Sequence, residues 1–356
     1  MWIIFLIILI VVIVVIPTTI VTGNKKEIGK TSTAAEITTA ITTRKSEQIV
    51  PSVIINNNTK WKQNAVTVAG GNGHGSESDQ LYYPSGIYVD NDDQSIYIAD
   101  KNNHRIVRWG FGANNGEIVA GGNGSGNEIH QLCGPLDVIL DKEKKYLIIC
   151  DGNNFRVIRW FRQNSQDQEI LIHDIGCQGL AMDNNGDLYI TDSRKHQVRR
   201  FQQGDIVGTV VAGENQPGNQ LDQLLGPSFI FVDQYYSVYV ADRLNSRVMK
   251  WIKDAFEGIL IAPRKVSDMY PSALQGPMGV IVDHMGNIYV STDGSNQITR
   301  WLPGAIEGTR VVGESQFGLG PTQLRQSQDL SFDRQGNLYV VDTGNSRIQK
   351  FLMDRD

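Results

Sequence analysis

The sequence contains few of the residues that hold disulfide-rich or zinc-binding domains together. Only 3 of its 356 residues are cysteine, and no two of them form a CxxC pair. Neither a disulfide scaffold nor a CxxC zinc module therefore fits this chain. The sequence also has no long amphipathic helical pattern and no GxSxG or HExxH motif. A stable core has to come from apolar burial, for which the chain is long enough.

Basic residues are also outnumbered by acidic residues in most of the chain. Residues 61–356 carry 27 Lys and Arg against 35 Asp and Glu, and the formal net charge of the whole chain is −5. Because phosphate backbones are bound by basic surfaces, this balance disfavours nucleic acid as a partner.

The N-terminus begins with an uninterrupted apolar run. Every residue from Trp2 to Ile16 is apolar, and the first ionised side chains are Lys25 and Lys26. Residues 1–23 are therefore predicted to be a signal peptide or an uncleaved signal-anchor, and the sequence leaves both open. We expect a single-pass membrane protein with an extracellular body, or a secreted protein. The lysines after the run would instead keep that side cytoplasmic by the positive-inside rule.

Residues 24–60 are predicted to form a Thr-rich stalk or linker. Residues 31–48 are rich in Thr and Ala without a core pattern, as in an extended stalk or a plain disordered linker. Asn57 and Asn123 begin N-glycosylation sequons, which are used only if the chain is exported.

One unit recurs six times in the rest of the chain. The copies span residues 86–109, 137–160, 179–201, 229–251, 279–301 and 329–351. Each copy holds three short runs rich in Val, Ile and Tyr, separated by Asp, Asn and Gly turn signals, which predicts an antiparallel meander. A fourth run follows five of the copies. The sixth copy lacks one, because the chain ends five residues after Phe351.

The missing strand has a candidate at the other end of the repeats. Residues 65–70 (AVTVAG) precede the first copy and resemble the fourth runs. The sequence therefore predicts an all-β domain over residues 61–356, a six-bladed β-propeller of four-stranded antiparallel blades. The N-terminal strand is expected to complete the last blade and close the ring.

The repeated pattern GIxVDxxGxIYVADxxNxRIxxW, seen best at Gly279 to Tyr289 and Gly336 to Phe351, resembles the NHL repeat. The resemblance implies a six-bladed propeller, as found in some ubiquitin ligases, in the peptide-amidating lyase and in bacterial receptor kinases. That lyase holds metal through channel histidines, and the six histidines here are scattered over different repeat positions. Its chemistry is therefore not transferred to this chain.

Residues present in nearly every copy are interpreted as scaffold. The first-strand aspartates, such as Asp283, are expected to accept backbone N–H groups in turns. A second aspartate and an arginine five residues later, such as Asp100 and Arg105, are expected to pair. Recurring Tyr and Trp residues are expected to pack between blades.

Residues that break the repeat on the variable loops are the candidates for ligand binding, because loops on a rigid ring commonly carry function. All are expected on one face, since the turns between second and third strands share it with the loops between blades. They are Tyr82, Tyr83, His104, Arg194, His196, Arg243 and Tyr270.

The cysteines carry a separate prediction. Cys150 occupies a core-strand position and is interpreted as a buried small residue. Cys133 and Cys177 precede adjacent blades, so a disulfide between them is a hypothesis for an exported protein.

Three functions remain open from the sequence. The preferred one is a non-catalytic module that binds a protein, peptide or glycan through the loop-rich face. The second is a metal-dependent lyase or lactone hydrolase at the central channel. The third is ubiquitin-ligase-like substrate or RNA recognition without a RING. No catalytic residue or cofactor is assigned. The sequence leaves open whether the central channel binds calcium or zinc.

Overall fold

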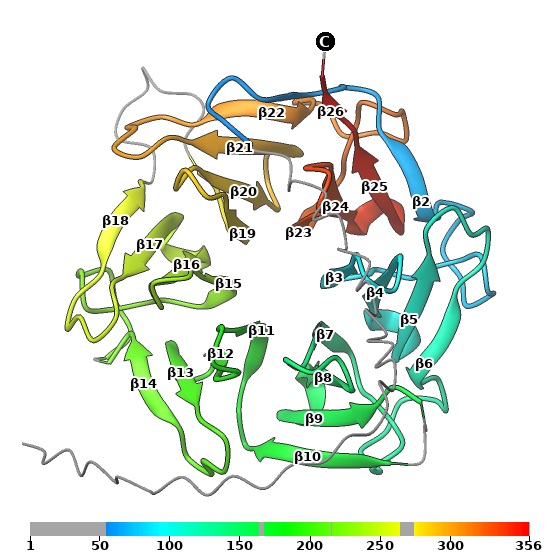
Figure 1. Ribbon diagram of the computed structural model, residues 1–356, viewed down its shortest axis with the longest axis horizontal. Coiled ribbons are helices and arrows are strands. Elements are labelled where there is room, and N and C mark those ends of the chain that lie inside the picture. The colour runs from blue at the N-terminus through cyan, green and yellow to red at the C-terminus, as the bar shows by residue number, and fades with distance from the viewer. Residues whose placement is uncertain (1–54, 164–166, 215, 264–273, 356) are drawn as a thin grey trace, which may run out of the picture. The chain divides into compact units, whose positions relative to one another are not determined.

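Six four-stranded antiparallel sheets surround a common centre, and each sheet is one blade (Figure 1). The computed structural model describes residues 55–163, 167–214, 216–263 and 274–355, all within the unit Ile49–Asp356. In each blade the first strand of the repeat lies innermost and the fourth lies outermost. The predicted all-β six-bladed propeller is therefore confirmed.

The strands follow the chain in blade order. Blade 1 contains β3 (Ile87–Asp90), β4 (Ser95–Asp100), β5 (Arg105–Gly110) and β6 (Glu117–Gly121). Blade 2 contains β7 (Pro135–Leu140), β8 (Tyr146–Asp151), β9 (Arg156–Phe161) and β10 (Gln168–His173). Blade 3 contains β11 (Cys177–Met182), β12 (Leu188–Asp192), β13 (Gln197–Phe201) and β14 (Thr209–Ala212).

The remaining three blades follow the same order. Blade 4 contains β15 (Pro227–Val232), β16 (Val238–Asp242), β17 (Arg247–Trp251) and β18 (Ile259–Ala262). Blade 5 contains β19 (Pro277–Val282), β20 (Ile288–Thr292), β21 (Gln297–Trp301) and β22 (Thr309–Gly313). Blade 6 contains β23 (Ser327–Phe332), β24 (Leu338–Asp342), β25 (Arg347–Phe351) and the N-terminal β2 (Val66–Gly70).

The N-terminal strand closes the ring as predicted. β2 pairs antiparallel with β25, from Val66 opposite Lys350 to Gly70 opposite Arg347. A second contact of the two chain ends joins β1 (Lys60–Trp61) to β26 (Met353–Asp354). The Trp61 indole N–H also donates to the Gly336 carbonyl at 2.9 Å. Two strand pairings therefore connect the beginning and end of the described chain.

The apolar core lies between neighbouring blades. In one cluster Tyr239 and Val248 of blade 4 pack with Val280 and Trp301 of blade 5. The equivalent aromatic residues of other repeats are buried in the same way, which confirms their predicted packing role. The first-strand aspartates also behave as predicted. Asp233 Oδ1, for example, accepts the Tyr235 N–H at 2.9 Å.

Four blades carry the predicted buried ion pair at the turn between their second and third strands. In those blades the turn is a short 3-10 helix, and these helices are η1 (Lys101–Asn103), η2 (Gly152–Asn154), η3 (Arg243–Asn245) and η4 (Thr343–Asn345). The arginine Nε to aspartate Oδ2 distances are 2.7 Å for Arg105–Asp100, 2.8 Å for Arg156–Asp151, 2.7 Å for Arg247–Asp242 and 2.6 Å for Arg347–Asp342.

Each of these arginines also holds the loop that enters its blade. Arg105 Nη1 donates to the Ser76 carbonyl at 2.7 Å, and the Asn103 amide donates to the Gly75 carbonyl at 2.8 Å. The entering loops and the η turns therefore share one face, which we call the loop face. The opposite face, called the turn face, carries the first-to-second turns, such as residues 91–94, and the third-to-fourth turns, such as residues 202–208.

The predicted Cys133–Cys177 disulfide is wrong. Cys177, at the start of β11, instead pairs with Cys150 on β8 of blade 2, with the two Cα atoms 5.7 Å apart. Cys133 is free and only partly buried. Cys150 is fully buried as expected, but the innermost strand of blade 3 brings Cys177 against it. The bridge therefore links adjacent blades 2 and 3.

Several predictions concern the N-terminal part of the chain. Residues 1–54, which include the apolar run and most of the predicted stalk, lie outside the described residues. In the described ranges no helix is sufficiently long and apolar to span a membrane. Asn57 and Asn123, the two sequon asparagines, are both exposed.

Candidate binding sites on the propeller

Three aromatic rings meet on the loop face where blade 6 adjoins blade 1. Tyr82 and Tyr83 lie in the loop before β3, and the His74 ring stacks on Tyr83 with 5.5 Å between centroids and 12° between planes. The Tyr82 ring is 5.5 Å from Tyr83 and 5.7 Å from His74. Tyr82 and Tyr83 are 38% and 36% exposed, so the cluster presents aromatic surface to solvent. We call these three residues the aromatic cluster.

The backbone of the aromatic cluster is held in a demanding conformation. Tyr83 has a φ of 50°, in the left-handed region, whereas the corresponding positions of three other blades hold Gly134, Gly226 and Gly276, and blade 6 holds Gln326 at 53°. A bulky residue in this region stores strain, which persists where the surrounding contacts determine it. Those contacts come from blade 6, because Ser346 Oγ accepts the Tyr83 N–H at 3.1 Å and lies 2.6 Å from His74 Nδ1.

His104 and His196 connect blades on the loop face. Their Nδ1 atoms accept the backbone N–H groups of Gly134 at 3.1 Å and Gly226 at 2.9 Å, each in the loop that enters the next blade. Both residues have a left-handed φ, near 53°. The two histidines are therefore equivalent, as the repeat predicts, and each already has a partner within the protein.

The other predicted loop residues lie apart from the aromatic cluster. Arg194 pairs with Asp174 at 2.9 Å and lies over the Phe155 ring, 4.6 Å from its centroid. Arg243 pairs with Asp293 at 2.7 Å. Tyr270 falls outside the described residues. The structure thus brings Tyr82 and Tyr83 together and adds His74, which sequence reasoning did not include.

A second candidate site is the cavity at the centre of the ring, with a volume of about 610 Å³. It is lined by the six innermost strands, mainly by Ile, Leu, Val, Phe and Met side chains. We call it the channel cavity. Its lining extends from Asp137 and Asp329, near the loop-face ends of β7 and β23, to turn-face residues such as Lys142 and Asp183.

Asp137 and Asp329 approach the same short segment of blade 1. Asp329 Oδ2 accepts the Ile87 N–H at 2.9 Å, and a Cβ at Gly86 would clash with Asp137 Oδ1. Asp137 Oδ2 also accepts the Leu180 N–H of blade 3 at 2.7 Å. The carboxylates therefore flank the start of β3 and connect neighbouring blades through backbone N–H groups.

Both carboxyl groups have a raised pKa. Burial raises the pKa of Asp137 well above its ordinary value, and the negative charge of Asp329 raises it further. Burial likewise raises the pKa of Asp329, against the opposing effect of the Ile87 and Leu330 N–H groups. Among the described residues, no lysine, arginine or histidine forms an ion pair with either carboxylate.

The sequence contained a signal for these two acids that was not used. They occupy the position that holds Gly86, Gly179 and Gly279 in three other copies and Phe229 in the fourth. A comparison of this position across the copies would have singled out two buried charges in place of glycine. Sequence reasoning considered the aspartates that recur in every copy and therefore missed these two, which do not recur.

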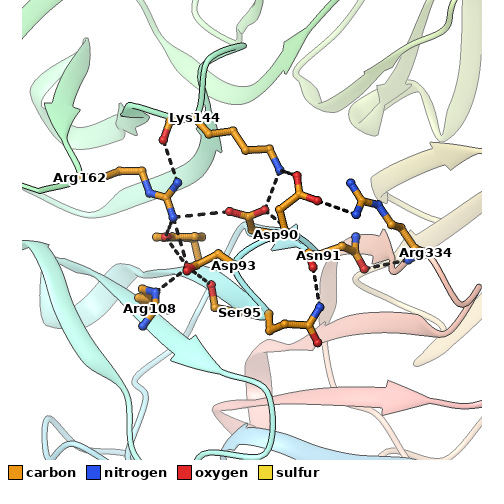
Figure 2. Close-up of polar contacts among 11 residues, drawn as sticks. Asp90, Asn91, Asp93, Ser95, Arg108, Lys144, Arg162 and Arg334 are labelled. Carbon is orange, nitrogen blue, oxygen red and sulfur yellow. Dashed lines mark hydrogen bonds and ion pairs between the residues drawn. The ribbon is translucent and has the colours of Figure 1, made fainter. Parts of the chain in front are cut away.

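A cluster of charged and polar side chains lies on the turn face, where the turn formed by residues 90–95 of blade 1 contacts two neighbouring blades (Figure 2). Asp90 accepts from Lys144 Nζ at 2.7 Å, and Asp93 accepts from Arg108 Nε at 2.7 Å. The hydrogen bond from Arg108 lowers the pKa of Asp93 to about 2. The Arg334 N–H of blade 6 donates to Asn91 Oδ1 at 2.9 Å. These charges satisfy each other, so we interpret this group as a brace between blades.

Comparison with known proteins connects the repeats to a family. The family model described as NHL repeat matches residues 81–109, 176–201 and 324–351. The chain contains NHL repeats in a six-bladed β-propeller. The matched segments contain the three innermost strands of blades 3 and 6, and those of blade 1 except the end of β5.

Solved structures share the fold of this NHL-repeat propeller at low sequence identity. A Bacteroides thetaiotaomicron protein of unknown function has a TM-score of 0.62 at 17% identity, covering 82% of this chain and 76% of its own. An auxiliary nutrient binding protein from the same organism has 0.59 at 13%, covering 85% and 75%. A Xanthomonas campestris gluconolactonase has 0.56 at 13%, covering 78% and 88%. At such identities these matches indicate the fold alone.

The described part of the propeller offers limited means of holding a metal ion. Within it, no group of three or more His, Cys, Asp or Glu side chains is arranged to bind one. The two channel aspartates provide a pair of carboxylates whose oxygens already accept backbone N–H groups. The donor set therefore does not fit a tightly held zinc ion, which takes three or four protein ligands.

Proposed function

We propose that this NHL-repeat propeller is a binding module that recognises a protein, peptide or glycan through its loop face. The aromatic cluster carries the proposal, because its rings are exposed while its backbone is fixed by Ser346. Rigid aromatic side chains bury large areas at low entropic cost, which suits them to binding.

Other features of the same face support an interaction surface. Phe155 and Leu244 are 44% and 59% exposed on η turns, and Phe317 and Leu319 are 64% and 75% exposed in the loop entering blade 6. They add exposed apolar surface to the loop face at blades 2, 4 and 6. Arg194 and Arg325, which lie over Phe155 and Phe317, add cationic groups beside them.

We further propose that the propeller acts outside the cytoplasm, either tethered by residues 1–23 or secreted. The Cys150–Cys177 disulfide supports this, because such bridges persist in oxidising compartments. Exposure of Asn57 and Asn123 is compatible with glycan attachment. Expression in a secretory cell, followed by glycosidase treatment and carbonate extraction, tests export and tethering. A chain that stays unglycosylated in the cytosol would contradict this proposal.

The binding proposal is tested on arrays of glycans and peptides with the purified protein. We expect a double variant, Tyr82→Ala with Tyr83→Gly, to lose binding at least tenfold, while its melting temperature stays the same or rises. Glycine at position 83 matches the residue of three equivalent blades and removes strain. Tyr235→Ala, at a 71% exposed tyrosine on the turn face, is the matched control. Equal loss in both variants, or in neither, would contradict a role for the aromatic cluster.

A further inference from the structure

The channel cavity combines an apolar wall with two buried acids at one end. Asp137 and Asp329 are 3% and 8% exposed, and both line the cavity. Most other lining side chains are aliphatic or aromatic, including Ile139, Phe231 and Ile281. A volume of about 610 Å³ lies within the range of sites for small molecules. The cavity therefore suits a ligand whose body is apolar and whose one polar end reaches the acids.

The acids determine which polar end fits. Each carboxylate oxygen accepts one backbone N–H, from Val138, Leu180, Ile87 or Leu330, and retains capacity for another donor. A buried carboxylate without a cation is costly, so a positively charged ligand group would be favoured there. Gly86 packs closely against Asp137, because a Cβ at this position would lie only 2.4 Å from Asp137 Oδ1.

The other charged groups of the cavity do not supply that cation. Lys144 pairs with Asp90 and Asp92, and Lys142 Nζ donates to the Asn185 carbonyl at 3.5 Å, all on the turn face. Asp141 and Asp183 lie at this same end and accept N–H groups of their own turns. Tyr88 lies between the two ends, and burial raises the pKa of its hydroxyl.

We propose that the channel cavity binds a small apolar molecule carrying a primary ammonium group, with the ammonium donating to Asp137 and Asp329 and the apolar part against the inner strands. A primary ammonium supplies three N–H donors to the two carboxylates, whereas an alcohol supplies one. Binding of the cation favours the ionised carboxylates and releases a proton from the acid pair. The affinity therefore rises as pH increases through the raised pKa values of the two carboxyl groups.

The test is isothermal titration calorimetry of the full purified chain with hexylammonium, compared with hexan-1-ol and hexanoate. We expect hexylammonium to bind at least tenfold more tightly than hexan-1-ol, and hexanoate to show no binding. Titrations in phosphate and Tris buffers should differ in heat, because a proton is released. Equal binding of the alcohol, or no buffer dependence, would overturn the proposal, as would displacement of hexylammonium by calcium or zinc chloride.

Variants of the two acids test whether the ammonium group binds at Asp137 and Asp329. Asp137→Gly and Asp329→Gly place the glycine of other blades at this position, and each should remove the preference for hexylammonium over hexan-1-ol. Glu257→Gln, at an exposed turn-face acid, is the matched control and should keep it. If the glycine variants unfold, Ser331→Phe decides, because it introduces the side chain of the equivalent Phe231 into the cavity without changing the acids. Retained hexylammonium binding in Ser331→Phe would overturn the proposal.

Discussion

At the scale of single residues, the repeat makes both agreement and departure informative. An aspartate–arginine ion pair recurs in four blades. In blade 4 it joins Asp242 and Arg247, whose side chains are 0% and 9% exposed. The guanidinium also donates to three loop carbonyls, those of Asn219, Gln220 and Gln223. One arginine thus satisfies a buried carboxylate and holds a whole loop.

Removing this arginine should therefore cost much more than removing a surface partner. We expect Arg247→Met to lower the free energy of unfolding by about 3–5 kcal/mol, since it leaves Asp242 buried without its cation. Lys145→Met, in a pair with Glu143 whose side chains are more than 60% exposed, should leave it nearly unchanged, because solvent screens that pair. Chemical denaturation measures both. Similar losses of unfolding free energy in the two variants would contradict the expectation that the buried ion pair matters more than the exposed one.

The channel acids predict a pH dependence of stability. A carboxyl group whose pKa is raised in the folded state contributes stability that is fully present below its unfolded pKa, near 3.8, and is lost as pH rises through the raised value. Melting curves of the wild type and the Asp137→Gly, Asp329→Gly double variant should therefore diverge from pH 4 to pH 8. The wild type should lose stability relative to the variant. Parallel curves would show that the two carboxyl groups keep ordinary pKa values.

At the scale of the element, the strand positions followed from the sequence but contacts between blades did so only in part. The repeated runs predicted every blade strand, because period and turn signals recur six times. The disulfide was assigned to the wrong cysteine because sequence separation gives no measure of which strands pack together. β8 and β11 belong to different blades, and only their packing places Cys150 beside Cys177. The stacking of His74 on Tyr83 depends on blade packing in the same way.

The bridge between β8 and β11 should stabilise the propeller measurably. Its cysteines are 27 residues apart, so a double variant, Cys150→Ser with Cys177→Ser, should lose about 3 kcal/mol of unfolding free energy. Cys133→Ser should have little effect, because that thiol is free. Alkylation of the unfolded, unreduced protein should label Cys133 alone. A labelled Cys150, with Cys133 and Cys177 protected, would support the Cys133–Cys177 pairing instead.

At the scale of the whole molecule, β2 replaces the strand that the last repeat lacks. Removal of residues 61–70 would leave β25 with unpaired backbone groups and would expose the apolar surface around the buried Ala69. We expect the melting temperature to fall by about 10 °C or more. Removal of ten residues from 31–40, upstream of the described chain, is the control of equal length. An unchanged melt after the first deletion would contradict closure by β2.

Closure by β2 also sets an order of events during biosynthesis. β2 is synthesised before every other blade strand, and its partner residues Arg347–Lys350 lie in the blade strand that is synthesised last. Throughout that interval the growing chain carries an unpaired strand at one end and an unfinished blade at the other. Because contacts this distant in sequence form slowly, the nascent propeller depends on chaperones or on rapid docking of its first five blades. A chain that stopped before Arg347 would lack β25 and form an open arc, whose two free edges invite association between copies.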